Sequence, residues 1–442
     1  MHLTAVSFGS RGDIEPFLTL GRGLAEAGHH VRILTHPEYA HDAADSGMEF
    51  IGARGRSTRE LIESDEGREV MRHVRNPVVM MRRIAAVLAP ELRLIYEDVL
   101  SAVRESDAVL AFPATFPALD VADHLGCPIL HIHHVPMVPT RHFPIPAAYI
   151  RTRTLTPLGN RASYQTDAWM LWQLTRGAVD RARREVLGPA ARDYGIRQAL
   201  AQRRRRVGSL VGVSRHVVTP PADWPADTVV CGYWWPHAGD GDTASALTAE
   251  TRRFLADGPA PLFFGLGSTP VADPAAVTRD VAGAARDAQV RLILQSGWAG
   301  LGGGIRDPGV HVVGDVAYDA LFPHVAGVVH HGGAGTTALG LRHARPTLCI
   351  PAVADQFFWG HRMAAIGAGP SPLPLGRLRR DRLAGRLAAL ARDGGYAARA
   401  SQIAVGLAGE DGSATAVAAV DRLLPRRGAA GRVTAAPATS RL

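Results

Sequence analysis

Length, composition and charge already limit what this chain can be. Its 442 residues exceed what one hydrophobic core usually holds, and 46% hydrophobic with 20% charged residues is typical of a globular protein of two large domains. Every one of the 49 Lys-or-Arg positions is arginine, which excludes Schiff-base enzymes and Walker-type phosphate loops, because both need a lysine.

The first residues lack the basic stretch and apolar run of a secretory signal, and no apolar run reaches the ~18 residues that span a bilayer. We therefore expect a cytoplasmic protein without a transmembrane segment, for which peripheral membrane contact stays open. Cys127, Cys231 and Cys349 are far apart, so we expect buried thiols and neither disulfides nor a metal site. The arginine run 203–206 is expected to be a solvated helix face or loop, because no nucleic-acid-binding motif accompanies it.

The first half of the chain alternates strand and helix patterns. The predicted elements are, in chain order, strand 2–8, Gly-rich turn 9–12, amphipathic helix 14–27, strand 30–35, a helical stretch 78–103, strand 108–112, helix 116–125 and strand 128–133. This order predicts a parallel, helix-covered sheet in a Rossmann-like domain over residues 1–219.

Turn formers and aromatic residues then predominate, and we interpret residues 220–260 as an interdomain connection with one short helix near 248–256. Alternation resumes afterwards, with predicted strands 262–264, 291–295, 311–313, 327–330 and 347–350, helices 275–288 and 336–343, and a helical pattern over 383–424. The spacing predicts a second Rossmann-like domain over 261–405. We expect a helix over 406–425 to pack back on the first domain, and a disordered tail over 426–442.

The clearest chemical signal is HHGGAGTT, which follows strand 327–330 and opens a helix. Gly332, Gly333 and Gly335 let the backbone turn tightly and present N–H groups at a helix N-terminus, a place that binds phosphate. His331 and Thr336 add side-chain donors to the same turn. The alternative is a tight turn that needs glycine for folding alone.

Polar residues also follow the next strand, where Asp355 and Gln356 lie just past its carboxyl end. Ligands bind at such ends in open α/β sheets. A carboxylate beside an amide suits adjacent sugar hydroxyls, which need both donors and acceptors. The alternative for Asp355 is a helix cap.

Two further turns complete this pattern in the second half. Ser268, in GLGSTP, can donate a hydrogen bond to a phosphate, and Trp298, in SGW, offers a flat surface for a nucleobase. A place in the core is the alternative for Trp298. All these turns lie at strand ends of one domain, so together they predict one site for a nucleoside diphosphate.

In the first half, FGSRGDIEP places Asp13 at the start of a helix. It is either an N-terminal cap or a general base that faces the interdomain cleft. The segment 131–146 crowds histidines, prolines and Phe143 into one loop, which predicts an acceptor-binding wall lined by His134 and Phe143. A loop that merely covers the core is the alternative.

At these motifs the sequence resembles the glycosyltransferase-B superfamily, specifically the family of sterol glucosyltransferases and of the bacterial transferases that decorate glycopeptides, macrolides and other natural products. The resemblance covers GSRGDIEPFLTLGRGLAEAGHHVRILTH, CGYWWP, FFGLGSTP, SGWAGL and the block from HHGGAGTT to GAGPSPLPL. Within that block, DQFFWG and GAGPSPLPL look more like the sterol enzymes. The long plant-type donor signature that begins with tryptophan is absent.

The resemblance implies two Rossmann-like domains that face each other across a cleft, with the nucleotide sugar held by the second. It assigns the pyrophosphate to His331, Gly333, Gly335 and Thr336 with help from Ser268, the sugar to Asp355 and Gln356, the base to Trp298 and the acceptor proton to Asp13. It implies no metal and no cofactor, because the nucleotide sugar is a co-substrate.

We therefore expect an inverting glycosyltransferase that moves a hexose, with glucose favoured, to a hydroxyl of a lipophilic small molecule. A uridine diphosphate donor is favoured over a thymidine diphosphate one. A nucleotide-sugar-binding helper without turnover is the alternative, against which Asp13, Asp355 and Gln356 argue. An NAD-linked oxidoreductase is disfavoured, because GSRGD is not the GxGxxG of dinucleotide-binding turns.

Overall fold

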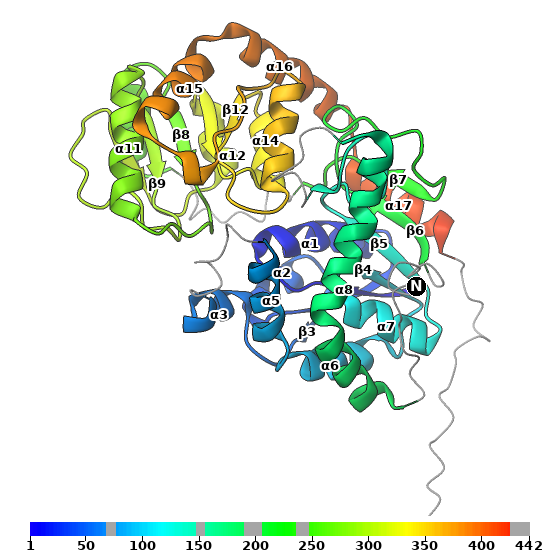
Figure 1. Ribbon diagram of the computed structural model, residues 1–442. Coiled ribbons are helices and arrows are strands. Elements are labelled where there is room, and N and C mark those ends of the chain that lie inside the picture. Colours follow the sequence, from blue (N-terminus) through cyan, green and yellow to red (C-terminus); the bar gives the residue numbers. More distant parts are fainter. Residues whose placement is uncertain (68–76, 147–154, 190–205, 236–246, 425–442) are drawn as a thin grey trace, which may run out of the picture.

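The computed structural model describes residues 1–67, 77–146, 155–189, 206–235 and 247–424. It contains two α/β domains, each a parallel sheet with helices packed on it, and Figure 1 shows them one above the other. The predicted tail over 426–442 and Arg203 to Arg205 lie outside the described residues.

The first domain has a seven-stranded sheet of order β3-β2-β1-β4-β5-β6-β7, and every neighbouring pair is parallel. Its strands are β1 (His2–Val6), β2 (His30–Thr35), β3 (Glu49–Gly52), β4 (Ala108–Ala111), β5 (Ile129–His133), β6 (Arg206–Val211) and β7 (Thr228–Val230). Its helices are α1 (Arg11–Glu26), α2 (Ala40–Asp45), α3 (Thr58–Glu63), α5 (Pro77–Leu88), α6 (Leu92–Val103), α7 (Phe116–Leu125) and α8 (Pro157–Leu187). The strand order reverses between β1 and β4, which is where such sheets bind ligands.

The second domain repeats this plan on five parallel strands of order β10-β9-β8-β11-β12, with its reversal between β8 and β11. Its strands are β8 (Leu262–Gly265), β9 (Leu292–Gln295), β10 (Val310–Val313), β11 (Gly327–His330) and β12 (Thr347–Cys349). Its helices are α10 (Ala249–Ala256), α11 (Pro274–Asp287), α12 (Tyr318–Leu321), α13 (Ala334–Arg342), α14 (Gln356–Ala365), α15 (Arg380–Arg392) and α16 (Gly394–Ala408). Short 3₁₀ helices cover Pro37–Tyr39, Phe322–His324 and Leu375–Arg377.

Several elements differ from the sequence expectations. β7 lies inside the segment 220–260 that we interpreted as connection, so the first sheet gains an edge strand before the chain crosses to the second domain. Arg206 opens β6 and donates to Asp227 at 2.6 Å, so this end of the arginine run is on a strand and not on a solvated helix or loop. α1 begins at Arg11 instead of residue 14, because Ser10 and Asp13 form a capping box.

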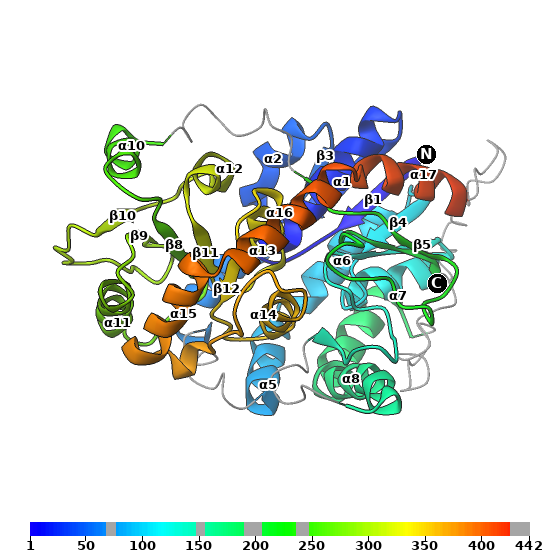
Figure 2. The same ribbon diagram turned by 90° about the horizontal axis from the view of Figure 1, so that it is seen from above.

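The predicted helical stretch 383–424 consists of three helices, the last being α17 (Gly412–Leu423). The breaks fall at Asp393 and Asp411, whose side chains accept hydrogen bonds from the backbone N–H groups of Gly395 and Ala414 and so start new helices. α17 lies alongside α1 in the first domain (Figure 2), and Ala416, Ala419 and Val420 are part of that domain's core. The chain therefore ends its described course on the domain where it began.

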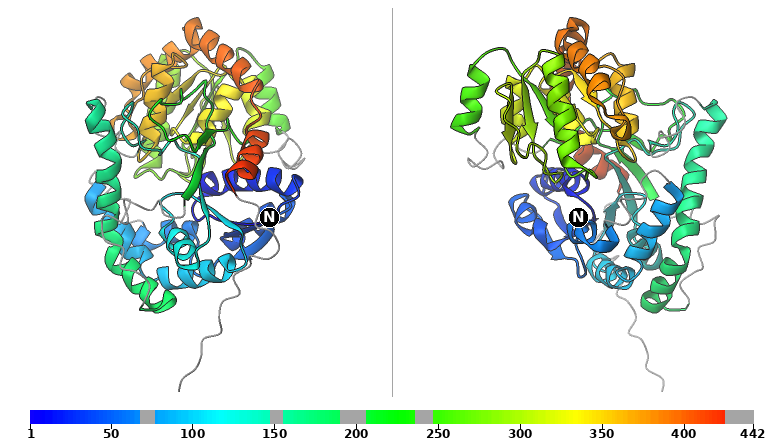
Figure 3. Two further views of the ribbon diagram at one scale, coloured as in Figure 1. Left: turned by 90° about the vertical axis from the view of Figure 1, so that its right-hand side faces the viewer. Right: turned by 60° about the vertical axis from the view of Figure 1, so that its left-hand side comes forward.

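A continuous apolar cluster joins the two domains, whose ribbons lie close together in both views of Figure 3. From the first domain it includes Val135 and Val138, and from the second Phe358, Trp359 and Met363. Arg362 on α14 also donates a hydrogen bond to the carbonyl of Val217. Within the described residues no single helix is long and apolar enough to cross a membrane, although α16 and α17 meet that criterion as a pair bent by 45°.

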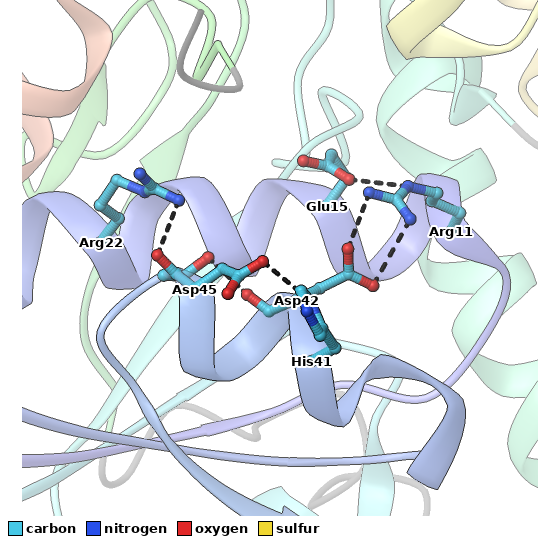
Figure 4. A network of polar contacts seen from close by, with 7 residues as sticks. Arg11, Glu15, Arg22, His41, Asp42 and Asp45 are labelled. Carbon is cyan, nitrogen blue, oxygen red and sulfur yellow. Dashed lines mark hydrogen bonds and ion pairs between the residues drawn. The ribbon is translucent and has the colours of Figure 1, made fainter. Parts of the chain in front are cut away.

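A polar network fixes the start of α1 against α2 (Figure 4). Arg11 pairs with Glu15 at 3.0 Å and with Asp42 at 3.1 Å, and about three turns further along α1 Arg22 donates to the carbonyl of Asp45 at 3.0 Å. Exposed pairs of this kind add little stability, ~0.2–1 kcal/mol each. Their effect is positional, because they hold the helix end on which Asp13 lies.

Candidate functional site

The HHGG turn joins β11 to α13 at the carboxyl edge of the second sheet. His330, the last residue of β11, is 1% exposed, and its Nδ1 accepts a hydrogen bond from the backbone N–H of Gly332 at 3.0 Å. Burial holds the pKa of His330 well below its usual range, so the ring is neutral and carries its proton on Nε2. The neutral ring of His330 therefore holds the turn in place through its hydrogen bond with Gly332.

The three glycines of this turn have different reasons to be glycine. Gly332 has a φ of 95°, and a Cβ there would lie 2.7 Å from the carbonyl oxygen of Gln356. At Gly333 a Cβ would lie 2.5 Å from Nε2 of His331, so glycine at 332 suits the backbone and glycine at 333 leaves room for the His331 ring. Gly335, in the first turn of α13, has nothing within 4 Å of a Cβ, so its open side faces space that a ligand can occupy. Thr336 follows it on the same turn.

His331 lies beside these glycines and next to the turn after β8. A Cβ on Gly267 would lie 3.0 Å from Cε1 of His331, which places the two turns in contact. Burial lowers the pKa of His331 to about 4, so the ring is neutral at neutral pH. Within the described part of the chain its Nδ1 has no hydrogen-bond partner, although it is covered by protein. A ligand oxygen can reach this atom only if the ring turns.

The turns after β8 and β9 are also in contact. A Cβ on Gly297 would lie 2.8 Å from the carbonyl oxygen of Gly267, and the backbone N–H of Trp298 donates to that same oxygen at 3.2 Å. Ser268 is exposed beside them, and the Trp298 side chain is 44% exposed. Trp298 is therefore not a core residue, and the structure brings it together with the predicted phosphate residues.

Asp355 and Gln356 lie between β12 and α14. Asp355 is at the N-cap position, but its side chain caps nothing; Oδ2 instead accepts from Nε1 of Trp359 at 2.9 Å. Oε1 of Gln356 accepts from the backbone N–H groups of Ala352 and Val353 at 2.8 and 3.1 Å, which leaves the Nε2 group to donate. Ala354 has a φ of 49°, a strained conformation for alanine that the loop maintains beside these side chains.

In the first domain Asp13 uses its two carboxylate oxygens differently. Oδ2 accepts from the backbone N–H and the hydroxyl of Ser10 at 2.9 and 3.0 Å, so it caps α1. Oδ1 lies 3.6 Å from Nε2 of His134, which follows β5. Burial acts to raise the pKa of Asp13, but the interactions with His134 and Ser10 outweigh it and lower the pKa overall. Asp13 is therefore ionised at neutral pH.

The predicted acceptor wall divides into two parts. His134 is 14% exposed and packs against Phe112, with ring centroids 5.0 Å apart, while it faces Asp13, which is 44% exposed. Phe143 instead packs against Phe358 of the second domain, with ring centroids 5.4 Å apart, within the apolar cluster between the domains. The structure thus brings His134 to Asp13 and places Phe143 in the interdomain packing.

Charges from both domains meet at this point. Burial raises the pKa of Asp355; the hydrogen bond from Trp359 and the charge of His134 counteract this effect, and the charge of Asp13 reinforces it. The charges of Asp13 and His134, in the first domain, therefore act on the carboxyl of Asp355, in the second.

Two contributors to this site were not predicted. His330 was treated as the end of a strand, and Trp359 was not singled out. The i, i+4 spacing of Asp355 and Trp359 on a helix start indicates a side-chain pair and is the one signal that could have been used. Among the described residues no group of three or more His, Cys, Asp or Glu is arranged to hold a metal ion.

Comparison with known proteins defines the class first. The model of the glycosyltransferase family 28 N-terminal domain matches residues 3–112, and that of the erythromycin biosynthesis protein CIII-like C-terminal domain matches residues 287–421. The solved structure of the glycotransferase of kitacinnamycin superposes with a TM-score of 0.68 at 21% identity, over 96% of this chain and 99% of that one. The fold is thus the two-domain glycosyltransferase-B fold, as the sequence predicted.

The sequence relatives then define the family. The sterol 3-beta-glucosyltransferase UGT80B1 of Arabidopsis thaliana is 31% identical over 94% of this chain and 67% of its own length. A sterol 3-beta-glucosyltransferase of Neosartorya fischeri is 29% identical over 96% of this chain but only 29% of its own length. The chain belongs to the glycosyltransferase family that contains these enzymes, which confirms the predicted resemblance. It spans about two thirds of the plant relative and under a third of the fungal one.

Proposed function

We propose that this glycosyltransferase moves glucose from a uridine diphosphate donor, with inversion, to a hydroxyl of a lipophilic small molecule. The relatives' names support a glucosyl donor and a lipophilic acceptor. The observation that carries the proposal is the pair of Asp13 and His134 in the first domain, 3.6 Å apart, whose charges act on Asp355 of the second. A base and a sugar-binding carboxylate there fit transfer better than binding alone.

The donor half offers what a nucleoside diphosphate needs. The backbone N–H groups at the start of α13 and the positive end of its dipole favour the diphosphate charge. The unpartnered Nδ1 of His331 adds a side-chain contact, and Ser268 and Thr336 add hydroxyls. Oδ1 of Asp355 and the Nε2 group of Gln356 remain for sugar hydroxyls.

The reaction follows from this arrangement as a single displacement. Oδ1 of Asp13 takes the proton of the acceptor hydroxyl as its oxygen forms a bond to the anomeric carbon. The bond from that carbon to the diphosphate oxygen breaks on the opposite face, and the leaving diphosphate carries the electron pair. Attack and departure on opposite faces invert the anomeric centre. His134, whose Nε2 lies 3.6 Å from Oδ1 of Asp13, stabilises the ionised carboxylate before transfer.

The test is mass spectrometry of products from a panel of nucleotide sugars and acceptors. Uridine and thymidine diphosphate glucose are each incubated with polycyclic, macrolide and phenolic alcohols. We expect a mass increase of one hexose that depends on Asp13, and an axial-to-equatorial change at the anomeric centre by NMR. Tight binding of a nucleotide sugar with no product from any acceptor would instead favour the non-catalytic helper.

A further inference from the structure

One contact crosses the cleft at the predicted nucleobase position. Cζ of Arg59, the second residue of α3, lies 5.2 Å from the centroid of the Trp298 ring. That distance is within the range of a cation–π interaction. Since Arg59 belongs to the first domain and Trp298 to the second, the guanidinium covers the face of the indole that is turned toward the opposite domain.

The backbone of Arg59 is held in place although its side chain is exposed. α3 starts with a capping box in which Ser57 accepts from the backbone N–H of Glu60 at 3.2 Å and Glu60 accepts from that of Ser57 at 2.7 Å. Thr58 also approaches Nε2 of His36 at 3.3 Å. A fixed helix start therefore directs a long, adjustable arginine side chain toward Trp298.

Trp298 is equally well positioned. Its backbone donates to Gly267, whose turn touches His331, so the indole is held at a set offset from the phosphate turn. An exposed indole held in this way is a stacking platform. Its cleft-facing side is the one that Arg59 now covers.

We propose that Arg59 is a donor-binding residue and that the nucleobase inserts between it and Trp298. This inference rests on the proposed function. Two stacked layers at van der Waals distance need a separation of about 7 Å, and the observed separation is 5.2 Å. Arg59 must therefore move by about 2 Å, well within the reach of an exposed arginine side chain.

The sandwich makes chemical sense for a pyrimidine base. A planar guanidinium stacks on an aromatic face, which lysine cannot do, and its N–H groups can also donate to ring carbonyls. Donor binding would then bridge the two domains through Trp298, the base and Arg59. The opposite hypothesis is a plug, in which Arg59 blocks the base and must leave.

Calorimetry separates these hypotheses. Arg59→Ala should weaken binding of uridine diphosphate by roughly 2- to 30-fold, and Arg59→Lys should lose most of the same affinity. Pyrophosphate, which lacks the base, should bind all variants equally. Arg93→Ala is the matched control, because Arg93 is exposed on α6 of the same domain and pairs with Glu97 at 3.0 Å. Its affinity should equal that of the wild type.

Unchanged or tighter binding of uridine diphosphate to Arg59→Ala would overturn the sandwich, and tighter binding would establish the plug. Trp298→Ala distinguishes this failure from failure of the proposed site. Trp298→Ala could weaken the binding of uridine diphosphate but not of pyrophosphate, while Arg59→Ala changes the binding of neither. In that case the base site at Trp298 stands, and only the proposed role of Arg59 is refuted. If neither uridine nor thymidine diphosphate binds the wild type, the proposed function falls as well.

Discussion

Replacing Asp13 by asparagine separates catalysis from capping at a single position. The carboxylate caps α1 through Oδ2 and faces His134 through Oδ1. Asparagine keeps one oxygen, which can continue to accept from Ser10, and puts an uncharged amide toward His134. The substitution therefore removes the base and leaves the cap.

The two effects differ greatly in size. A positioned general base contributes about 10²- to 10⁴-fold to rate, so turnover of Asp13→Asn on an aliphatic alcohol should fall by that factor. That is about 3–5 kcal/mol of activation free energy. Loss of the cap would cost ~0.5–2 kcal/mol if the oxygen were removed, and less here because it is retained. Affinity for the nucleotide sugar should stay the same.

The pH dependence supplies an internal check on stability. The folded-state pKa of Asp13 lies below its ordinary value, so the charged form contributes stability that is present above about pH 4 and is lost as pH falls through the folded pKa. Any destabilisation of Asp13→Asn should therefore appear at neutral pH and shrink in acid. Thermal unfolding at pH 7 and below pH 4 measures it.

Asp42→Asn is the matched control. It weakens the Arg11 pair that holds the same helix end but does not touch the cleft, so turnover should change less than about 2-fold. The acceptor series adds a second criterion, because acidic phenols ionise with less help and should lose less rate. Full turnover of Asp13→Asn on an aliphatic alcohol would refute the role of base, and His134 would be tested next.

Three further outcomes are expected. Affinity of the wild type for a nucleotide sugar, measured by calorimetry, should rise as pH falls from 7 toward 5, because a bound diphosphate favours the charged form of His331, whose pKa burial lowers to about 4. His331→Ala should bind the nucleotide sugar more weakly and show no such pH dependence. Asp355→Ala combined with Gln356→Ala should lower turnover yet leave uridine diphosphate affinity nearly intact, and equal losses would contradict a sugar-reading role. His330→Leu should weaken diphosphate binding roughly 5- to 10-fold, because it leaves the N–H of Gly332 without its acceptor. His330→Asn should restore the binding, because its side-chain oxygen can take the place of Nδ1 of His330.

The elements that could be predicted are those whose neighbouring residues show a clear pattern of apolar and polar side chains. Strands β1, β4, β8 and β11 are buried on both faces and therefore appear as continuous apolar runs. The edge strand β7 has three half-buried residues among turn formers, so nothing local marks it. The long helix α8 is polar on much of its surface and lacks a clear apolar stripe, so its pattern resembled none of the templates.

In the candidate site, too, features formed by neighbouring residues could be predicted, whereas contacts between distant residues could not. Glycine-rich turns are local, and the sequence placed His331 and Trp298 on them because each follows a strand. The pairing of Asp13 with His134 joins positions far apart in the chain and cannot be read from spacing. The contact of Arg59 with Trp298 depends in addition on how the two domains face each other. The sequence analysis treated helix cap and general base as alternatives for Asp13. A carboxylate has two oxygens, however, and here Oδ2 contacts Ser10 while Oδ1 faces His134.

The relative placement of the domains rests mainly on apolar contacts. Trp359 is fully buried in the interdomain cluster and also donates its indole N–H to Asp355. The residue that packs the interface therefore orients Asp355, which is predicted to bind the sugar. α17 adds a second attachment, since Trp234 donates to the carbonyl of Gly412 at 3.2 Å where the chain returns to the first domain. Packing contacts of this kind lose their energy over small separations, whereas charges act over longer distances. The relative position of Asp13 and Asp355 therefore depends on the packed interface between the domains.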